Sequence, residues 1–297
     1  MRNLHRYFYR IYFSAIQENI VHNPKISFAN LSLEEEKKRL SDSEEDRERR
    51  KELSEKIGKI EKCNVAVIEY RNSIFCAQNY TNFRNPIPML SLDKYQIFPL
   101  CISYPGLVTG VGVNHEAKIE GEFKLGVHFD YTYGMPVVYG SSVKGVLRNS
   151  FILKQEHGKI LEYEPYFLNK ITGTQWGQKE IEALFNDIFE GEDANGPKSI
   201  YNRDIFFDAV LVKADSKGRI LCSDSITPHG DNPLKNPTPL TFLKIAPGCE
   251  LEFRFKLVDS VIDGKTFSAE QKKTLFNEII RTVGVGAKTN VGYGQFQ

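Results

Sequence analysis

Residues 249–258 read CELEFRFKLV, and this stretch shows the clearest secondary-structure pattern in the chain of 297 residues. Apolar and charged side chains alternate along it, with Leu251, Phe253, Phe255 and Leu257 between Glu250, Glu252, Arg254 and Lys256. Because successive side chains of a strand point to opposite faces, this alternation predicts a half-buried strand. A strand of this kind belongs in a sheet that is covered on one side only.

Three amphipathic helices are predicted around this strand. The helix that follows it begins with the capping-box pattern Ser268-Ala-Glu-Gln271, in which two side chains satisfy amides at a helix start. The other two helices are expected at about residues 141–151, with Ser141 as the cap, and at residues 178–189. Further strands are expected at residues 97–104, 106–113, 123–131 and 204–212. This mixture favours an α+β fold, an antiparallel sheet with helices packed on one face, over a parallel doubly wound sheet.

The N-terminal third of the chain has a different composition. Residues 1–20 show a helical stripe of apolar side chains. Residues 34–62 carry eleven acidic and ten basic side chains with few apolar ones, which predicts a solvated helix, a hairpin or a mobile insertion. We therefore expect a helical, charged extension over residues 1–96 and the main domain over residues 97–297.

The overall composition excludes several classes of protein. Lys and Arg number 39 against 38 for Asp and Glu, a net charge of +1, whereas a domain devoted to nucleic acid is usually strongly basic. A local basic patch can still be offset by acidic residues elsewhere. The five cysteines include no Cys-x-x-Cys pair, which disfavours disulfides and a cysteine zinc site. No apolar run reaches the ~18 residues of a membrane span, so a cytoplasmic protein is expected.

Residues 284–294 read GVGAKTNVGYG, with four glycines in eleven residues after a predicted helix. Glycines let a backbone approach a ligand closely, and Lys288 and Thr289 add a cation and a hydroxyl, so the segment suits a polyanion. The segment is not a P-loop, because Ala287 stands where glycine must precede the lysine. It is not a dinucleotide fingerprint either, because Thr289 takes the place of the third glycine. A tight turn with a solvated lysine is the alternative.

Residues 134–148 read GMPVVYGSSVKGVLR, which predicts a strand, a tight turn and a helix start. Free amides and the helix dipole favour an anion at such a start. Ser141 and Ser142 add hydroxyl donors, and Lys144 and Arg148 lie one turn apart on the helix. The alternative is a capped core helix with two surface cations, but two phosphate-suited segments in one chain favour a phosphodiester ligand.

These two segments resemble the hallmarks of the RAMP superfamily, the repeat-associated proteins of CRISPR systems. DSITPH at residues 224–229 and PTPLTFL at residues 237–243 make the resemblance more specific, because they are similar to the sixth RAMP subunits of type III-B (Cmr) effector complexes. The resemblance covers about residues 97–297. One departure is Val138-Tyr139, where the family usually carries Ile-Pro. The resemblance implies a ferredoxin-like (RRM-like) fold.

For function, the resemblance implies a non-catalytic RNA-binding subunit near the 3′ end of the guide. The implied partners are CRISPR guide RNA, target RNA and other RAMP subunits of the Cmr complex, with no cofactor, metal or membrane. Carried over residue by residue, the RNA-facing candidates are Ser141, Ser142, Lys144, Arg148, Gly284, Gly286, Lys288, Thr289, Gly292 and Tyr293. Contacts to the RNA backbone position RNA without reading its sequence, and Tyr293 either stacks on a base or packs inward.

His229 leaves a second function open. Histidine transfers protons near neutral pH, and some RAMP nucleases cleave RNA without metal by using one, so a metal-independent CRISPR-repeat endoribonuclease is the alternative. An orienting hydrogen bond or a contact to a neighbouring subunit explains His229 equally well. A third interpretation is an assembly module that contacts only protein. A two-metal site built from Asp130, Asp204, Asp208 and Asp224 is disfavoured, because each has a simpler role at a strand end or a turn.

Overall fold

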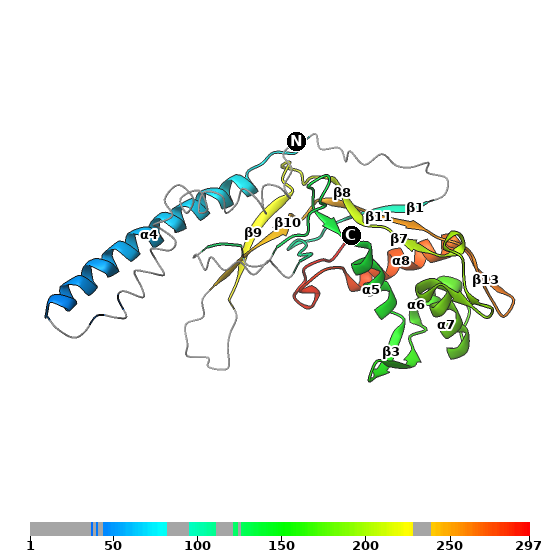
Figure 1. Cartoon of the computed structure of the whole chain (residues 1–297). Coiled ribbons are helices and arrows are strands. Elements are labelled where there is room, and N and C mark those ends of the chain that lie inside the picture. The colour runs from blue at the N-terminus through cyan, green and yellow to red at the C-terminus, as the bar shows by residue number, and fades with distance from the viewer. Residues whose placement is uncertain are drawn as a thin grey trace.

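The computed structural model describes residues 37, 40, 44–81, 95–110, 121–123, 126–227 and 239–297. Figure 1 shows the arrangement of the helices and strands. The helix predicted within the first twenty residues and the candidate His229 lie outside the described residues.

An antiparallel sheet forms the centre of the molecule. Its five strands are β1 (Gln96–Cys101), β2 (Val137–Val138), β7 (Ile205–Phe206), β8 (Ala209–Lys213) and β11 (Glu250–Lys256). β11 pairs with β1 on one side and with β8 and β7 on the other, and β2 pairs with β8 at the edge. The C-terminal segment pairs with the chain just after β1, through an antiparallel bridge between Ile102 and Phe296.

Two helices pack against this sheet, α5 (Gly140–Asn149) and α8 (Ala269–Val283). In chain order the elements are β1, α5, β8, β11, α8 and the C-terminal segment, and in space the strands run C-terminal segment, β1, β11, β8. This order is the ferredoxin-like arrangement. The predicted α+β fold with an antiparallel sheet is therefore confirmed.

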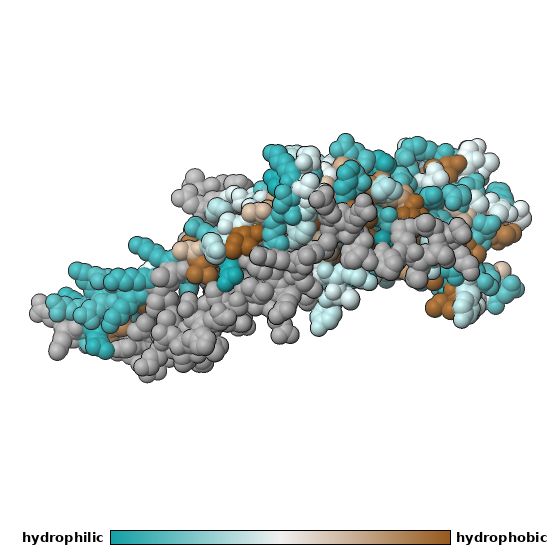
Figure 2. All heavy atoms as spheres, turned by 90° about the horizontal axis from the view of Figure 1, so that it is seen from above, coloured by the Kyte–Doolittle hydropathy of each residue, from teal (hydrophilic) through white to brown (hydrophobic). Residues whose placement is uncertain are grey.

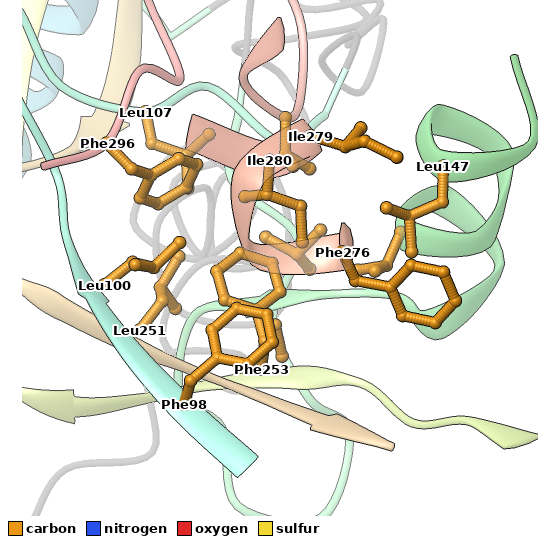
Figure 3. Packing of buried hydrophobic residues seen from close by; sticks show 14 of the residues in the cluster. Phe98, Leu100, Leu107, Leu147, Leu251, Phe253, Phe276, Ile279, Ile280 and Phe296 are labelled. Atoms are coloured by element: carbon orange, nitrogen blue, oxygen red, sulfur yellow. The ribbon is translucent and has the colours of Figure 1, made fainter. Parts of the chain in front are cut away.

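The hydrophobic core lies between the sheet and these helices. Apolar and charged positions of β11 alternate between buried and half-buried, as the sequence predicts. Figure 3 shows Phe98 of β1 and Phe253 of β11 lying against α8, which contributes Phe276 and Ile280. The rings of Phe98 and Phe253 are stacked with centroids 5.7 Å apart. Leu147 of α5 closes the same cluster.

The start of α5 differs from the sequence prediction. Ser141 is not the cap, because Tyr139 occupies the N-cap position and makes no side-chain cap. The carboxylate of Asp208 takes this role, and its Oδ1 accepts a hydrogen bond from the Gly140 amide at 2.7 Å. A Cβ on Gly140 would lie 2.4 Å from the carbonyl oxygen of Phe206, so only glycine fits here. The strand expected at 204–212 is likewise not continuous and consists of β7 and β8.

Other local predictions hold to different degrees. The capping box of α8 is confirmed, since Ser268 Oγ accepts from the Gln271 amide at 3.2 Å and Gln271 Oε1 accepts from the Ser268 amide at 2.9 Å. Within the described part of the strand expected at 123–131, Phe129 forms only an isolated bridge with Pro136. The helix expected at 178–189 consists of an α-helix followed by a π-helix.

Short elements inserted into the ferredoxin-like order complete the described fold. Between α5 and β8 these are β3 (Ile152–Glu156), β4 (Lys159–Tyr163), α6 (Tyr166–Thr172), α7 (Gln178–Phe185), the π-helix η3 (Asn186–Glu190), β5 (Glu192–Asp193), β6 (Gly196–Pro197) and η4 (Ile200–Asn202). Later in the chain they are β9 (Leu221–Ile226), β10 (Leu240–Ile245), β12 (Ser260–Ile262), β13 (Lys265–Phe267) and η5 (Thr289–Val291). β9 pairs with β10 in a hairpin, and β12 pairs with β13.

The charged run forms part of one long helix, α4 (Glu44–Cys76), which extends away from the sheet (Figure 1). Figure 2 shows hydrophilic side chains along its projecting end. Its C-terminal half packs on the rest of the protein. Ile68 is fully buried there, and Asn72 Nδ2 donates to the Gly121 carbonyl at 2.8 Å. The helical interpretation is therefore confirmed for residues 44–62. The domain boundary between residues 96 and 97 stays a prediction.

Candidate nucleic-acid interface

The first turn of α5 offers hydroxyls and few free amides. The side chains of Ser141 and Ser142 are both exposed. The Gly140 amide is already bonded to Asp208, and the Ser142 amide donates to the Tyr139 carbonyl at 2.8 Å. Of the first three amides of α5, only that of Ser141 is in the usual state of a helix start, where no acceptor is available inside the helix. The helix start is therefore less rich in anion-binding amides than the sequence suggests.

The two cations of α5 have different surroundings. Lys144 is half-buried with its Nζ 5.9 Å from the centroid of the Phe206 ring, and no carboxylate in the described part of the chain forms an ion pair with it. Arg148 pairs with Glu190 at 3.3 Å and lies over the ring of Phe185, 4.9 Å from its centroid. Lys144 therefore keeps a charge that is available to a ligand, whereas the charge of Arg148 is partly neutralised.

The glycine-rich segment is a folded turn that lies against residues 106–108. The Ala287 amide donates to the Val108 carbonyl at 2.7 Å, and the Gly294 amide donates to the Gly106 carbonyl at 2.8 Å. Lys288 adopts a left-handed conformation with φ 62° and leads into η5.

Exposure differs along this segment. Gly284 is buried and Gly286 is exposed, while Lys288, Thr289 and Gly292 are half-buried. The tight-turn alternative therefore describes the backbone of the segment correctly, and the turn still presents Lys288 and Thr289 at the surface.

Tyr293 packs inward. It is only 7% exposed, its ring meets Phe242 of β10 edge-on at 5.7 Å, and its hydroxyl donates to Asp224 Oδ2 at 2.8 Å. Lys244 pairs with the same carboxylate at 2.5 Å. Burial and the Asp224 carboxylate raise the pKa of the Tyr293 hydroxyl, so the hydroxyl remains a donor. Tyr293 thus holds the glycine-rich segment to the β9–β10 hairpin and is not available for stacking on a base.

The two candidate segments are linked indirectly through Val108 and Thr109. Val108 accepts the Ala287 amide of the glycine-rich segment, and Thr109 Oγ1 accepts the His128 amide at 2.7 Å. The His128 ring in turn stacks on Tyr139, directly before α5, with centroids 4.8 Å apart. Figure 1 shows the C-terminal segment, in red, between β10 and α5. The start of α5 and the end of α8 therefore lie at the same end of the sheet.

An exposed aromatic residue that the sequence analysis missed borders the glycine-rich segment. Tyr104 is 85% exposed and lies in the turn before Gly106. This turn is bonded to the C-terminal segment, since the Ser103 amide donates to the Gln295 carbonyl at 2.9 Å. In the sequence, the Pro105-Gly106 pair indicated a strand break at this point. It did not indicate that the C-terminal segment lies beside this break.

The four aspartates considered for a metal site each have a partner within the protein. Asp204 pairs with Lys272, Asp208 with the Gly140 amide and Asp224 with Lys244. Asp130 accepts from the amides of two following residues in its own turn. Across the described residues, no cluster of three or more His, Cys, Asp or Glu side chains could hold a metal ion. No helix within these residues has the length and apolar character that a membrane span requires.

Comparisons with known proteins identify the family to which the chain belongs. One similar solved structure is a chain of "Cryo-EM structure of the Type III-B Cmr-beta bound to cognate target RNA", with 20% identity, a TM-score of 0.47, and 83% of this chain and 74% of that chain covered. Another is Cmr6 from Pyrococcus furiosus, with 20% identity, a TM-score of 0.38, and 70% and 99% covered. No curated protein gives a significant match. The family model described as RAMP superfamily matches residues 101–297, well over half of the sequence, and the chain therefore belongs to the RAMP superfamily.

Proposed function

We propose that this chain is a non-catalytic, RNA-binding structural subunit of a type III-B CRISPR effector complex. It contacts the backbone of guide or target RNA near the 3′ end of the guide, in the cytoplasm, beside other RAMP subunits. Membership of the superfamily and the residue-level resemblance support this assignment. The observation that carries it is the indirect link between the two segments: Val108 bonds to the glycine-rich segment, and the adjacent Thr109 bonds to His128, whose ring stacks on Tyr139 before α5.

The composition of the sheet face that points away from α8 supports an RNA path at the sheet end. RRM-type domains stack bases on aromatic side chains of the sheet surface. Here the outward positions of β11 carry Glu250, Glu252, Arg254 and Lys256. Arg254 and Glu252 form an ion pair at 2.7 Å on this face. Glu250 pairs in turn with Lys213, so the charges on this face balance and offer a phosphodiester chain no net attraction, whereas Lys144 and Lys288 attract it.

A few cations give weak binding by the chain alone. Each phosphate contact with a single strand contributes a slope of about −0.7 to the dependence of log affinity on log salt. With two to four such contacts, the purified chain should bind RNA weakly and with a shallow salt slope. The near-neutral charge of the whole chain, +1, suits a subunit that shares its RNA path with neighbours.

Replacing Lys144 or Lys288 with alanine should weaken RNA binding by the complex reconstituted with this chain. Each substitution removes one cation, so each should lower the magnitude of the salt slope by about 0.7. The measurement is a titration of labelled RNA at several salt concentrations. Lys273→Ala is the matched control, because Lys273 lies in the first turns of α8, about 15 Å of helix away from Gly284. Unchanged slopes for both test variants would favour an assembly module that contacts only protein.

Labelled CRISPR-repeat RNA incubated with the full chain in EDTA should remain intact. A structural subunit performs no hydrolysis, with or without metal. Gel analysis of the RNA over time is the measurement. Cleavage that disappears in the His229→Ala variant would replace the structural role with the endoribonuclease alternative.

A further inference from the structure

Two aromatic rings stack directly before α5. The ring centroids of His128 and Tyr139 lie 4.8 Å apart with an interplanar angle of 28°. Tyr139 remains 39% exposed, although one face of its ring is covered by the imidazole. The pair therefore presents a flat aromatic surface to solvent, backed by a second ring.

The backbone on both sides of this pair is held in place. The amide of His128 donates to Thr109 Oγ1 at 2.7 Å, and its carbonyl accepts from the Val137 amide at 2.9 Å. The Tyr139 carbonyl accepts from the amides of Ser142 and Val143, at 2.8 and 3.0 Å. Because both rings stand on ordered backbone, a ligand that stacks on them loses little additional conformational freedom. Burial also lowers the pKa of His128, which favours a neutral imidazole at pH 7.

The helix start does not require a tyrosine at position 139. The backbone there has φ −59° and ψ 140°, values that proline also adopts. The core does not require this ring to be buried either, since more than a third of its surface is open to solvent. Neither the turn nor the core therefore fixes the identity of this residue.

We propose that Tyr139, backed by His128, is a stacking platform for one nucleobase of an RNA strand bound at the start of α5. The proposal rests on the proposed RNA-binding function and adds a base contact to a site otherwise made of backbone contacts. Tyr139 lies three residues before Ser142, whose side chain is exposed, and on the same segment as Lys144, so a nucleotide whose phosphate is held there has its base near the ring. Stacking of this kind accepts any base, because every base has a π-face.

Substitution at position 139 tests the platform in the reconstituted complex. Tyr139→Ala and Tyr139→Pro should each weaken RNA binding about 5- to 140-fold, the range for loss of one base–aromatic stack. Tyr139→Phe keeps the ring and should bind within about twofold of the unaltered chain. Thermal unfolding of each variant shows whether the helix start survives, and the proline variant retains the native φ.

An abasic scan separates stacking from a purely structural role. RNA carrying a single abasic nucleotide is titrated at each position against the unaltered chain and Tyr139→Ala. At the stacked position the two proteins should bind equally, because the missing base removes the same contact as the missing ring. If no position removes the difference, or if Tyr139→Ala binds as the unaltered chain does, the platform is disproved. Lys144→Ala and Lys288→Ala, measured in parallel, distinguish this failure from failure of the proposed function, which would leave those variants unchanged too.

Discussion

Replacing Lys272 with methionine should lower the free energy of unfolding by about 3–5 kcal/mol, the usual cost of leaving one member of a buried ion pair without its partner. Lys272 is only 1% exposed, and its Nζ donates to Asp204 Oδ2 at 2.6 Å. The side chain of Asp204 is also 1% exposed, so the methionine variant would leave a carboxylate with no cation at that distance and no access to water. Denaturant titration of the full chain measures the loss.

The pair belongs to a buried network that joins the ferredoxin-like core to its insertions. Asp204 Oδ1 accepts from the Val258 amide at 2.7 Å, and Lys272 Nζ lies 3.9 Å from Asp187 Oδ2 in the π-helix η3. Asp187 also accepts from the Ser260 hydroxyl of β12. Burial raises the pKa of Asp204 and lowers that of Lys272, so each charge depends on the other to persist.

Two further variants identify the cause of the loss. The double variant Lys272→Met, Asp204→Asn should recover part of the stability, because it removes both charges together. Lys213→Met breaks the exposed pair of Lys213 with Glu250, whose lysine is 67% exposed, and should leave stability nearly unchanged. A loss in Lys272→Met no larger than in Lys213→Met would show that the buried pair contributes nothing particular to stability.

Lys272 shows what could be predicted from the sequence and what could not. It lies three and four residues before Leu275 and Phe276, on the buried stripe of α8, so periodicity alone marks it as a lysine on an apolar face. Its partner Asp204 is 68 residues away, and no spacing rule connects the two. Periodicity and capping patterns are local, and they predicted β11 and α8 correctly for that reason.

The same limit applies to the candidate interface. Spacing placed Lys144 and Arg148 on one helix, but Glu190, which pairs with Arg148, is 42 residues away. The Asp208 carboxylate that replaces the expected Ser141 cap is 68 residues from Gly140. Tyr293 turns inward because its hydroxyl meets Asp224, 69 residues earlier in the chain. The sequence therefore indicated two candidate segments, which stay a prediction, while the charges and rings available within them depend on tertiary contacts.

Replacing Gly294 with alanine should destabilise the protein more than the same change at Gly292. Both residues have left-handed backbones, with φ 68° and 93°, so alanine costs about 1–2 kcal/mol at either position from backbone strain alone. At Gly294 a Cβ would also lie 1.9 Å from the carbonyl oxygen of Val285, a backbone atom that cannot rotate away. At Gly292 the nearest neighbour is Pro105 Cδ at 3.6 Å, an ordinary contact.

The difference between these two variants measures the close approach that shapes the glycine-rich segment. The Val285 amide donates to the Gly294 carbonyl at 2.9 Å, so relieving the clash separates the two ends of the turn that presents Lys288. Gly294→Ala should therefore also remove the contribution of Lys288 to RNA binding, and adding Lys288→Ala to it should produce no further loss. Denaturant titrations give the stability difference, and RNA titrations of the reconstituted complex give the coupling. Equal stabilities for the two alanine variants, or additive losses of RNA affinity, would show that Lys288 does not depend on this closed turn.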